Sequence, residues 1–375
     1  MTSAETGVES APVPEEQAQP DSDQKQIVYL WGAGATQAEI SYSGADPVNL
    51  LMRDNDLGAG VATRILQKLP AGAKESFAAD LGMDIEKLIS LLAACNVAKY
   101  NQLAEDIRRL YFQDIASSLA AQVLQTPKLA IGLLSMHKSA AFNRIERLAG
   151  ILTTNHDGLL QVAAQNVHGG VSIGVPFTST DLVQVAGTNT PVILQLHGSF
   201  TWTFGIPLKV SLLTNASGYD VDTVWIPPAI LKESKSYPFN KLAGMAYELL
   251  SKQCDVLRVV GSSLTQNDWN VLSMLFNAQR HRELTDGSPF RIELIMLPEA
   301  GDVIVDTCSY LQELTPIEHL SDGEGLADYK DKTTITDEMK NPLAFWMKQR
   351  VQFHYRNGHL GDALDPILAE IAGQP

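Results

Sequence analysis

Four short polar motifs, each directly after an apolar strand-like run, constrain the fold of this chain most strongly. The runs cover residues 27–31, 151–153, 192–196 and 256–260, and the motifs that follow them are Gly32–Thr36, Thr153–Asp157, His197–Ser199 and Gly261–Leu264. Short apolar runs with β-branched and aromatic side chains indicate buried strands. Open parallel sheets bind ligands at the carboxyl ends of their strands, where the topology switches. We therefore expect an α/β fold with a Rossmann-like parallel sheet flanked by helices, and the four motifs at one cleft.

The charge of the chain argues against direct binding of nucleic acid. Among 375 residues, 28 are Lys or Arg and 43 are Asp or Glu, which gives a net charge of −15. An acidic protein repels phosphates unless its basic residues gather in a patch, and the densest basic pair, Arg108-Arg109, lies on an expected helix. A small-molecule ligand is the better expectation.

Cysteine content and hydropathy give expectations about metal and compartment. The three cysteines lie far apart and form no C-x-x-C pair, so neither a zinc ribbon nor a disulfide framework is encoded. The N-terminal residues lack the pattern of a secretion signal, and no apolar run approaches the roughly 20 residues of a membrane helix. We expect a cytoplasmic protein with no membrane partner.

The chain divides into a tail and one large domain. Residues 1–25 are rich in Glu, Gln, Pro, Ser and Asp and predict a disordered acidic tail, although a docking segment is an alternative. The domain covers 26–375. Between about 47 and 148 the pattern becomes helical, with apolar residues at spacings of three and four from Leu103 to Val123, and this stretch predicts an inserted helical module.

Further elements are expected in the second half of the chain. Phe239–Gln253 predicts a crossover helix, Arg291–Leu297 a strand and Asp337–Tyr355 a late helix. Residues 204–226 combine β-branched runs with a turn at Asn215–Gly218, which predicts a hairpin near the cleft.

The first motif resembles a phosphate-binding turn. Gly32, Ala33 and Gly34 would let backbone amides approach a pyrophosphate, with Thr36 beside them, and a following helix N-terminus would add positive potential. The full G-x-G-x-x-G pattern is absent because position 37 is Gln. A tight structural turn explains these glycines equally well.

The second and third motifs supply candidate catalytic side chains. Asn155 offers a donor and acceptors for a ribose hydroxyl or a water, while Asp157 either caps the next helix or contacts the ligand. His197 follows an apolar strand and precedes Gly198, which would give a ligand room, and histidine is the commonest base near neutral pH. His156 is a second-choice base. The other His-Gly pair, at 168–169, follows a polar segment and is expected in a loop.

The fourth motif adds candidate ligand contacts. Gly261, Ser262 and Ser263 offer amides and hydroxyls to a phosphate or a ribose, although such a tripeptide is very common. Asp268 would accept a hydrogen bond from a ribose hydroxyl, or would simply begin the helix expected at 269–279.

Taken in order, the four motifs resemble the sirtuin-like NAD-binding family, which has GAG-x-[ST], T-x-N-x-D, a catalytic HG and G-[TS]-S. The resemblance covers about residues 26–300. It implies that NAD is the bound cofactor and substrate, and that Asn155 and His197 are the catalytic pair. The cofactor contacts that it implies are Gly32, Ala33, Gly34, Thr36, Thr154, Asp157, Gly261, Ser262, Ser263 and Asp268.

Two departures narrow the resemblance. Sirtuin deacylases have four zinc-binding cysteines between the HG and GTS segments, whereas this chain has only Cys254 there, and Thr154 replaces the deacylase glutamine. Both changes, and the helical insert, resemble the bacterial sirtuin-like NAD hydrolases of antiphage defence. The resemblance implies cleavage of NAD to nicotinamide and ADP-ribose, without a metal, by an abortive-infection effector.

An unrestrained NAD hydrolase would harm its host, so we expect the activity to be gated. The family implies a homo-oligomer or a separately encoded partner, such as a HerA-type ATPase. Two alternatives stay open: an NAD-dependent protein deacylase, and a non-catalytic sensor of NAD or ADP-ribose in a larger assembly.

Overall fold

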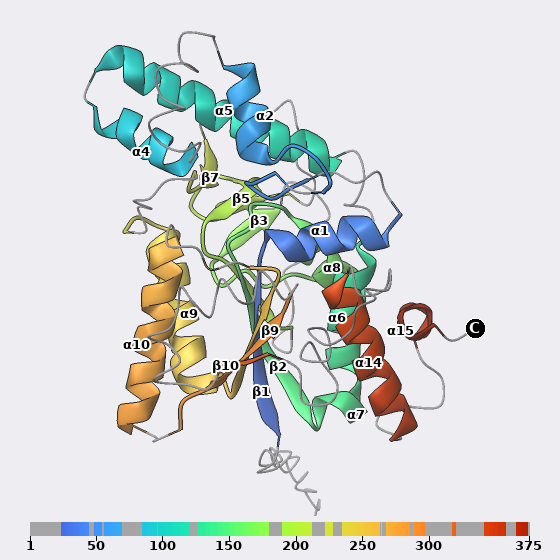
Figure 1. The fold of residues 1–375 in the computed structure, drawn as a ribbon. Coiled ribbons are helices and arrows are strands. Elements are labelled where there is room, and N and C mark those ends of the chain that lie inside the picture. The colour runs from blue at the N-terminus through green and yellow to red at the C-terminus, as the bar shows by residue number, and fades with distance from the viewer. Residues whose placement is uncertain are drawn as a thin grey trace, which may run out of the picture.

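The four motif-bearing runs are four neighbouring parallel strands in the computed structural model (Figure 1). They belong to a six-stranded sheet, within the described residues, whose order is β10-β9-β8-β1-β2-β4. Its strands are β1 (Lys25–Trp31), β2 (Glu146–Thr153), β4 (Val192–Gln195), β8 (Val256–Val260), β9 (Arg291–Ile295) and β10 (Ile317–His319). The structure describes residues 24–44, 49–54, 56–69, 85–95, 97–120, 126–179, 190–211, 222–227, 235–262, 264, 268–285, 288–296, 317–319, 341–357 and 365–373.

The strand order places a topological switch at the centre of the sheet. From the β4 edge, the strands follow the sequence order third, second, first, fourth, fifth and sixth, which is the Rossmann order. The chain leaves β1 toward β2 and β4 and then returns to β8 on the other side of β1. Register brings the strand ends level, because Trp31 pairs with both Thr153 and Val260, and Thr153 pairs with Gln195. The predicted α/β, Rossmann-like fold is therefore confirmed.

Helices cover both faces of this sheet, as Figure 1 shows. One face carries α9 (Phe239–Gln253), which packs on β1, β2 and β4, and α10 (Trp269–Thr285), which packs on α9. The other face carries α1 (Ala33–Tyr42), α6 (Lys128–Lys138), α7 (Ala140–Asn143), α8 (Leu159–His168), α14 (Pro342–Arg356) and α15 (Pro366–Ala372). The central strands are buried on both sides, which explains why they are almost continuously apolar.

Three of the described helices stand beyond the carboxyl ends of the strands (Figure 1). They are α2 (Val61–Lys68), α4 (Ile85–Ala94) and α5 (Ala98–Ala120), and α5 packs against the other two. We call these three helices the helical module. Two later helices of the predicted insert, α6 and α7, instead contact β2 of the main sheet. None of the described helices is long and apolar enough to span a membrane.

A second, smaller sheet lies between the main sheet and the helical module (Figure 1). Its order is β3-β6-β5-β7, from β3 (Phe177–Ser179), β5 (Gly198–Thr203), β6 (Leu208–Val210) and β7 (Thr223–Trp225). The hairpin predicted within 204–226 is wrong in its pairing, since β6 and β7 each pair with β5 rather than with one another. The strand that begins at Gly198 takes both of them as partners. The predicted turn at 215–218 lies outside the described residues.

Other sequence predictions match the structure closely. The helix predicted at Phe239–Gln253 has those bounds, the strand predicted from Arg291 ends at Ile295, and the late helix begins at Pro342. The predicted acidic tail lies almost wholly outside the described residues. The His-Gly pair at 168–169, expected in a loop, instead ends α8, where Gly169 adopts φ +70° as the C-cap.

A buried ionic cluster ties three strands to α14. Arg258 on β8 is only 1% exposed and forms ion pairs with Glu146 on β2 and Glu293 on β9, both at 2.7 Å. Arg350 of α14 also pairs with Glu146, and Trp346 lies under the Arg258 guanidinium, with the ring centroid 5.1 Å away. Burial opposes ionisation of Glu146, but the two arginines outweigh it and lower the pKa of this carboxyl. The charges therefore stay ionised inside the core.

His137 makes the stability of this region sensitive to acid. Its ring hydrogen-bonds the Tyr29 hydroxyl (2.9 Å) and the Glu146 carbonyl (3.1 Å), and burial lowers its pKa from 6.5 to about 4. Because the unfolded chain takes up this proton first, stability is fully present above pH 6.5 and is lost as the pH falls toward 4. The shift corresponds to about 3 kcal/mol. We expect the unfolding free energy of His137→Gln, measured with urea, to fall between pH 7 and pH 4 by about 3 kcal/mol less than that of the wild type.

The matched control is His281→Gln, because His281 is exposed on α10. This variant should keep the wild-type dependence of unfolding free energy on pH. An unchanged slope for His137→Gln would show that the buried imidazole does not carry the acid sensitivity.

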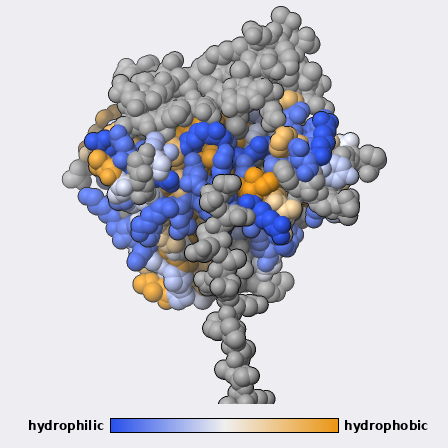
Figure 2. Space-filling model, turned by 90° about the horizontal axis from the view of Figure 1, so that it is seen from below, coloured by the Kyte–Doolittle hydropathy of each residue, from blue (hydrophilic) through white to orange (hydrophobic). Residues whose placement is uncertain are grey.

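The surface at the amino-terminal ends of the main-sheet strands lies opposite the carboxyl ends, where the four motifs lie. Figure 2 views the molecule from below, and the coloured residues there are mostly hydrophilic, with hydrophobic residues in small separate groups. The polar motifs lie at the opposite edge, near the small sheet and the helical module (Figure 1).

Candidate functional site

The Thr36 hydroxyl connects the first and second motifs. It accepts hydrogen bonds from Asn155 Nδ2 (3.0 Å) and Trp31 Nε1 (3.3 Å), and it donates to Asp157 Oδ2 (3.1 Å). A hydroxyl has one donor and two acceptor positions, so Thr36 makes all the bonds it can within the protein. Its side chain is 1% exposed, whereas Asn155 is half-buried. Thr36 therefore fixes the plane of the Asn155 amide rather than facing solvent.

Asp157 lies one residue before Gly158, the N-cap of α8, and its side chain nevertheless binds the first amide of that helix. Its Oδ1 accepts the Leu159 amide at the start of α8 (3.1 Å), while Oδ2 accepts from Thr36. Burial raises the pKa of this carboxyl, and the hydrogen bonds from Leu159, Thr36 and Asn155 oppose that rise. Residues 154–158, between β2 and α8, form what we call the Asn155 loop. Asp157 thus connects this loop both to α1, through Thr36, and to α8, through Leu159.

The glycines of the first and fourth motifs contact each other. The Gly34 amide donates to the Gly261 carbonyl (2.8 Å), and a Cβ on Gly261, which has φ +56°, would lie 2.2 Å from the Ala35 nitrogen. A Cβ on Gly32 would lie 2.5 Å from Ser262. These glycines are required by close packing of the two loops at the switch point. Because the Gly34 amide already donates to Gly261, a tight structural turn is enough to explain this glycine.

The third motif forms the turn between β4 and β5. His197 is 5% exposed, and its carbonyl accepts the Ile226 amide (2.7 Å). Gly198 has φ +73°, and a Cβ there would lie 2.3 Å from the Val224 carbonyl oxygen. Room for a ligand at this glycine stays a prediction, and the structure supplies a separate requirement for it. Close approach of β7 requires it.

Gln195 brings the second and third motifs together. Its Nε2 donates to the carbonyls of Asp157 (2.7 Å) and Asn155 (3.3 Å), and it lies two residues before His197. The imidazole rings of His156 and His197 are 6.2 Å apart between centroids. The structure therefore brings the Asn155 loop and the His197 turn side by side, as the sequence predicted.

The fourth motif and the remaining predicted contacts lie around this point. Ser262 is buried, with 7% exposure, and Thr154 is half-buried. Asp268 directly precedes α10, in the helix-starting position that the sequence allowed. Ser263 lies outside the described residues.

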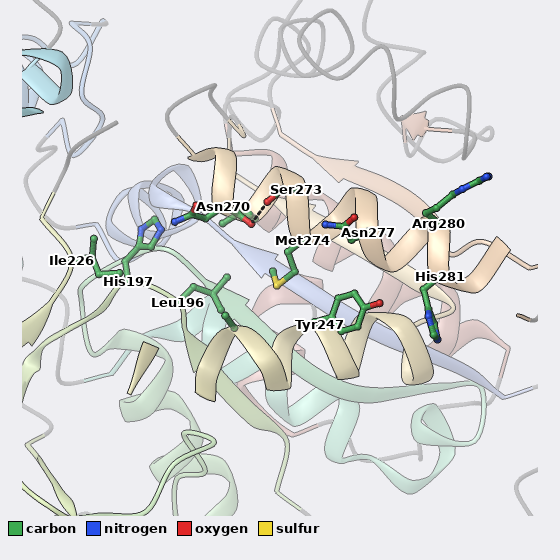
Figure 3. Close-up of a pocket in the computed structure, with 12 residues that line it drawn as sticks. Leu196, His197, Ile226, Tyr247, Asn270, Ser273, Met274, Asn277, Arg280 and His281 are labelled. Carbon is green, nitrogen blue, oxygen red and sulfur yellow. Dashed lines mark hydrogen bonds between the residues drawn. The ribbon is translucent and has the colours of Figure 1, made fainter. Parts of the chain in front are cut away.

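A cavity of about 650 Å³ begins at His197 and runs between α9 and α10. Figure 3 shows His197 and Ile226 at one end, Asn270 close to His197, and Arg280 and His281 at the other end. Its described lining is Leu196, His197, Ile226, Ala243, Tyr247, Asn270, Val271, Ser273, Met274, Asn277, Arg280 and His281. That described lining contains no carboxylate, and His197 is the only predicted site residue in it, so this cavity does not bear out the expectation that the four motifs share one cleft.

Two residues at this site were not predicted from the sequence. Gln195 is the one polar residue of the β4 run, and a polar group in an apolar strand could have drawn attention to it. Tyr111 comes from the helical module and meets His156 with ring centroids 6.1 Å apart. Its helical spacing is that of the other apolar residues of α5, so nothing in the local sequence distinguishes Tyr111 from an ordinary core residue.

No family model matches this chain, and no curated protein matches it. Among the described residues, no group of three or more His, Cys, Asp or Glu side chains is placed to hold a metal ion. The likeness to sirtuin-like proteins thus depends on the four motifs and on their positions at neighbouring strand ends.

Proposed function

We propose that this chain is a sirtuin-like NAD glycohydrolase, which cleaves NAD to nicotinamide and ADP-ribose. The observation that carries the proposal is the meeting of the Asn155 loop and the His197 turn at the carboxyl ends of adjacent strands, where Gln195 joins them and Thr36 binds Asn155. These ends lie beside the topological switch, where open α/β sheets bind ligands. The family's catalytic Asn and His map to these two residues.

The chemistry requires little more than orientation and one base. Nicotinamide leaves as a neutral molecule, so its departure needs no general acid, and the transition state resembles an oxocarbenium ion. The Thr36 hydroxyl accepts a hydrogen bond from Asn155 Nδ2 and so fixes the side-chain amide. The Oδ1 atom of the same amide then binds a water or a ribose hydroxyl. His197 accepts a proton from the attacking water or from a ribose hydroxyl, a step that usually contributes roughly 100- to 10,000-fold.

The charge of the cavity suits a dinucleotide. The chain as a whole carries −15, yet the described cavity lining contains Arg280 and no carboxylate. A volume of about 650 Å³ also lies within the usual range of ligand cavities. The phosphates of NAD would therefore meet no carboxylate along the described cavity lining. The switch-point loops, with the α1 N-terminus, remain the proposed pyrophosphate contacts.

Thr36→Val tests the role of the hydroxyl that orients Asn155. The substitution keeps the side-chain shape but leaves Asn155 Nδ2 and Asp157 Oδ2 without this partner. We expect at least about a tenfold loss of NAD cleavage and about 1–3 kcal/mol lower stability. Thr36→Ser retains the hydroxyl and should stay close to the wild type in both measurements. Equal activity of Thr36→Val and Thr36→Ser would contradict the role.

We further propose that the protein acts in the cytoplasm as an antiphage, abortive-infection effector gated by homo-oligomerisation or by a separate partner, such as a HerA-type ATPase. The basis is chemical, since continuous NAD loss would poison the host. Specific activity should rise with protein concentration or on addition of the partner. A dilute monomer with full activity would exclude gating.

Product analysis tests the reaction itself. We would incubate the chain with NAD, alone and with host lysate, and separate the products by chromatography. Equimolar nicotinamide and ADP-ribose support the glycohydrolase. Formation of O-acyl-ADP-ribose only with an acetylated peptide would point to a deacylase instead. Tight binding without turnover under every condition would identify a sensor.

A further inference from the structure

The side chain of His156 points away from the Thr36 network into an aromatic cluster. Its neighbours in the loop, Asn155 and Asp157, both contact Thr36. The His156 ring instead stacks on Phe200 of β5, with centroids 5.1 Å apart and planes at 27°. It also meets Trp225 of β7 edge-on at 5.3 Å. The loop that carries Asn155 is therefore held from two sides.

Helix α5 completes this cluster from the helical module. Tyr111 stacks on Trp225, with centroids 5.9 Å apart and planes at 6°, and meets His156 edge-on. Phe112 packs on Phe200 with centroids 4.5 Å apart. Aromatic pairs in such arrangements are worth about 0.5–1.5 kcal/mol beyond their burial. Several pairs that share His156 therefore hold its ring in one orientation.

The backbone passes this restraint to both candidate catalytic residues. The His156 carbonyl accepts the Phe200 amide (2.9 Å) and the Ser199 hydroxyl (2.9 Å). Phe200 and Ser199 lie on β5, which begins directly after His197. A displacement of the cluster would thus disturb the loop that carries Asn155 and the strand that follows His197, and so change the placement of one relative to the other.

Ion pairs and packing join the three helices of the helical module next to Tyr111. Asp114, one turn further along α5, pairs with Arg64 (2.6 Å) and Lys68 (3.1 Å) of α2, and α4 packs on α5. Burial, together with the nearby carboxylates Glu86 and Asp268, raises the pKa of the Tyr111 phenol, so the ring stays neutral.

We propose that Tyr111 is a positioning residue, which sets the placement of Asn155 relative to His197 through His156 and couples the helical module to the site. The catalytic part of this proposal rests on the proposed NAD cleavage. The module is then the element through which a partner or an oligomer contact would turn activity on or off, because any movement of α5 is transmitted to the loop.

The test compares Tyr111→Leu, Tyr111→Phe and Tyr100→Leu. Tyr111→Leu should lower kcat for NAD about 10- to 100-fold while KM changes less than about threefold, because misplacement affects the reaction more than binding. Tyr111→Phe keeps the ring and should retain activity within about threefold. Tyr100 lies near the start of the same helix and serves as the matched control, with wild-type kcat expected.

Hydrogen exchange gives a readout that does not depend on NAD cleavage. In Tyr111→Leu the Phe200 amide, which donates to His156, should exchange about tenfold faster or more, while amides of β1 keep their protection and report an intact fold. Faster exchange in a chain that never cleaves NAD would retain the positioning role and reject the proposed function. Unchanged exchange at Phe200 would overturn the proposal, and so would equal kcat for Tyr111→Leu and Tyr100→Leu in a chain whose wild type cleaves NAD.

Discussion

Replacement of His197 by Ala should lower the rate of NAD cleavage by about 100- to 10,000-fold, the usual contribution of a general base. Asn155→Ala should cost about 100-fold, because the water and the ribose lose their orienting amide. In the proposed mechanism the two side chains act on one step, so the double variant should not show the product of the single effects. Initial rates of nicotinamide release measure all three.

The chain offers matched controls for both substitutions. His168 belongs to the other His-Gly pair, at the end of α8, and Asn166 lies exposed on the same helix. His168→Ala and Asn166→Ala should cleave NAD at the wild-type rate. If His197→Ala matched His168→Ala, the base would have to be another group, and His156 would be the first to examine.

Replacement of Arg258 by Met should strongly destabilise the fold. It leaves the buried carboxylate of Glu293 without its 2.7 Å partner on β8, and it removes both hydrogen bonds that Arg258 donates to Glu146, at 2.7 and 2.8 Å. Removal of one member of a buried ion pair costs about 3–5 kcal/mol, because the remaining charge is uncompensated. That loss is a large part of the roughly 5–15 kcal/mol that keeps a typical domain folded.

Urea unfolding checks this expectation against a surface arginine. Arg109 is half exposed on α5 and pairs with Asp106 one turn away at 2.8 Å. Arg109→Met should change the unfolding free energy by less than about 1 kcal/mol. Similar midpoints for Arg258→Met and Arg109→Met would mean that the buried cluster contributes no more than an exposed pair.

The strands could be predicted from the sequence because each is a short apolar run with β-branched residues. Their order could not, because pairing of β1 with β8 joins residues more than two hundred positions apart. The same limit applies to the site. The prediction that Asn155 and His197 meet came from the rule for strand ends, whereas the hydrogen bond from Asn155 to Thr36 depends on the packing of α1 against the loop.

The glycines illustrate why a motif does not settle the role of its residues. Gly198 and Gly261 both have positive φ and both lie against a neighbouring backbone, yet the sequence could not distinguish that requirement from room for a ligand. Tyr111 illustrates the opposite case. Its helical spacing is that of an ordinary core residue, and only the three-dimensional structure places it against the loop that carries Asn155.

The position of bound NAD tests the central claim most directly. We would determine the crystal structure of the His197→Ala protein with NAD, since this variant should bind the dinucleotide without cleaving it. The nicotinamide ribose should lie within hydrogen-bond reach of Asn155 and next to residue 197, with the phosphates near the switch-point loops. NAD bound away from Asn155, or no NAD bound at millimolar concentration, would contradict the account.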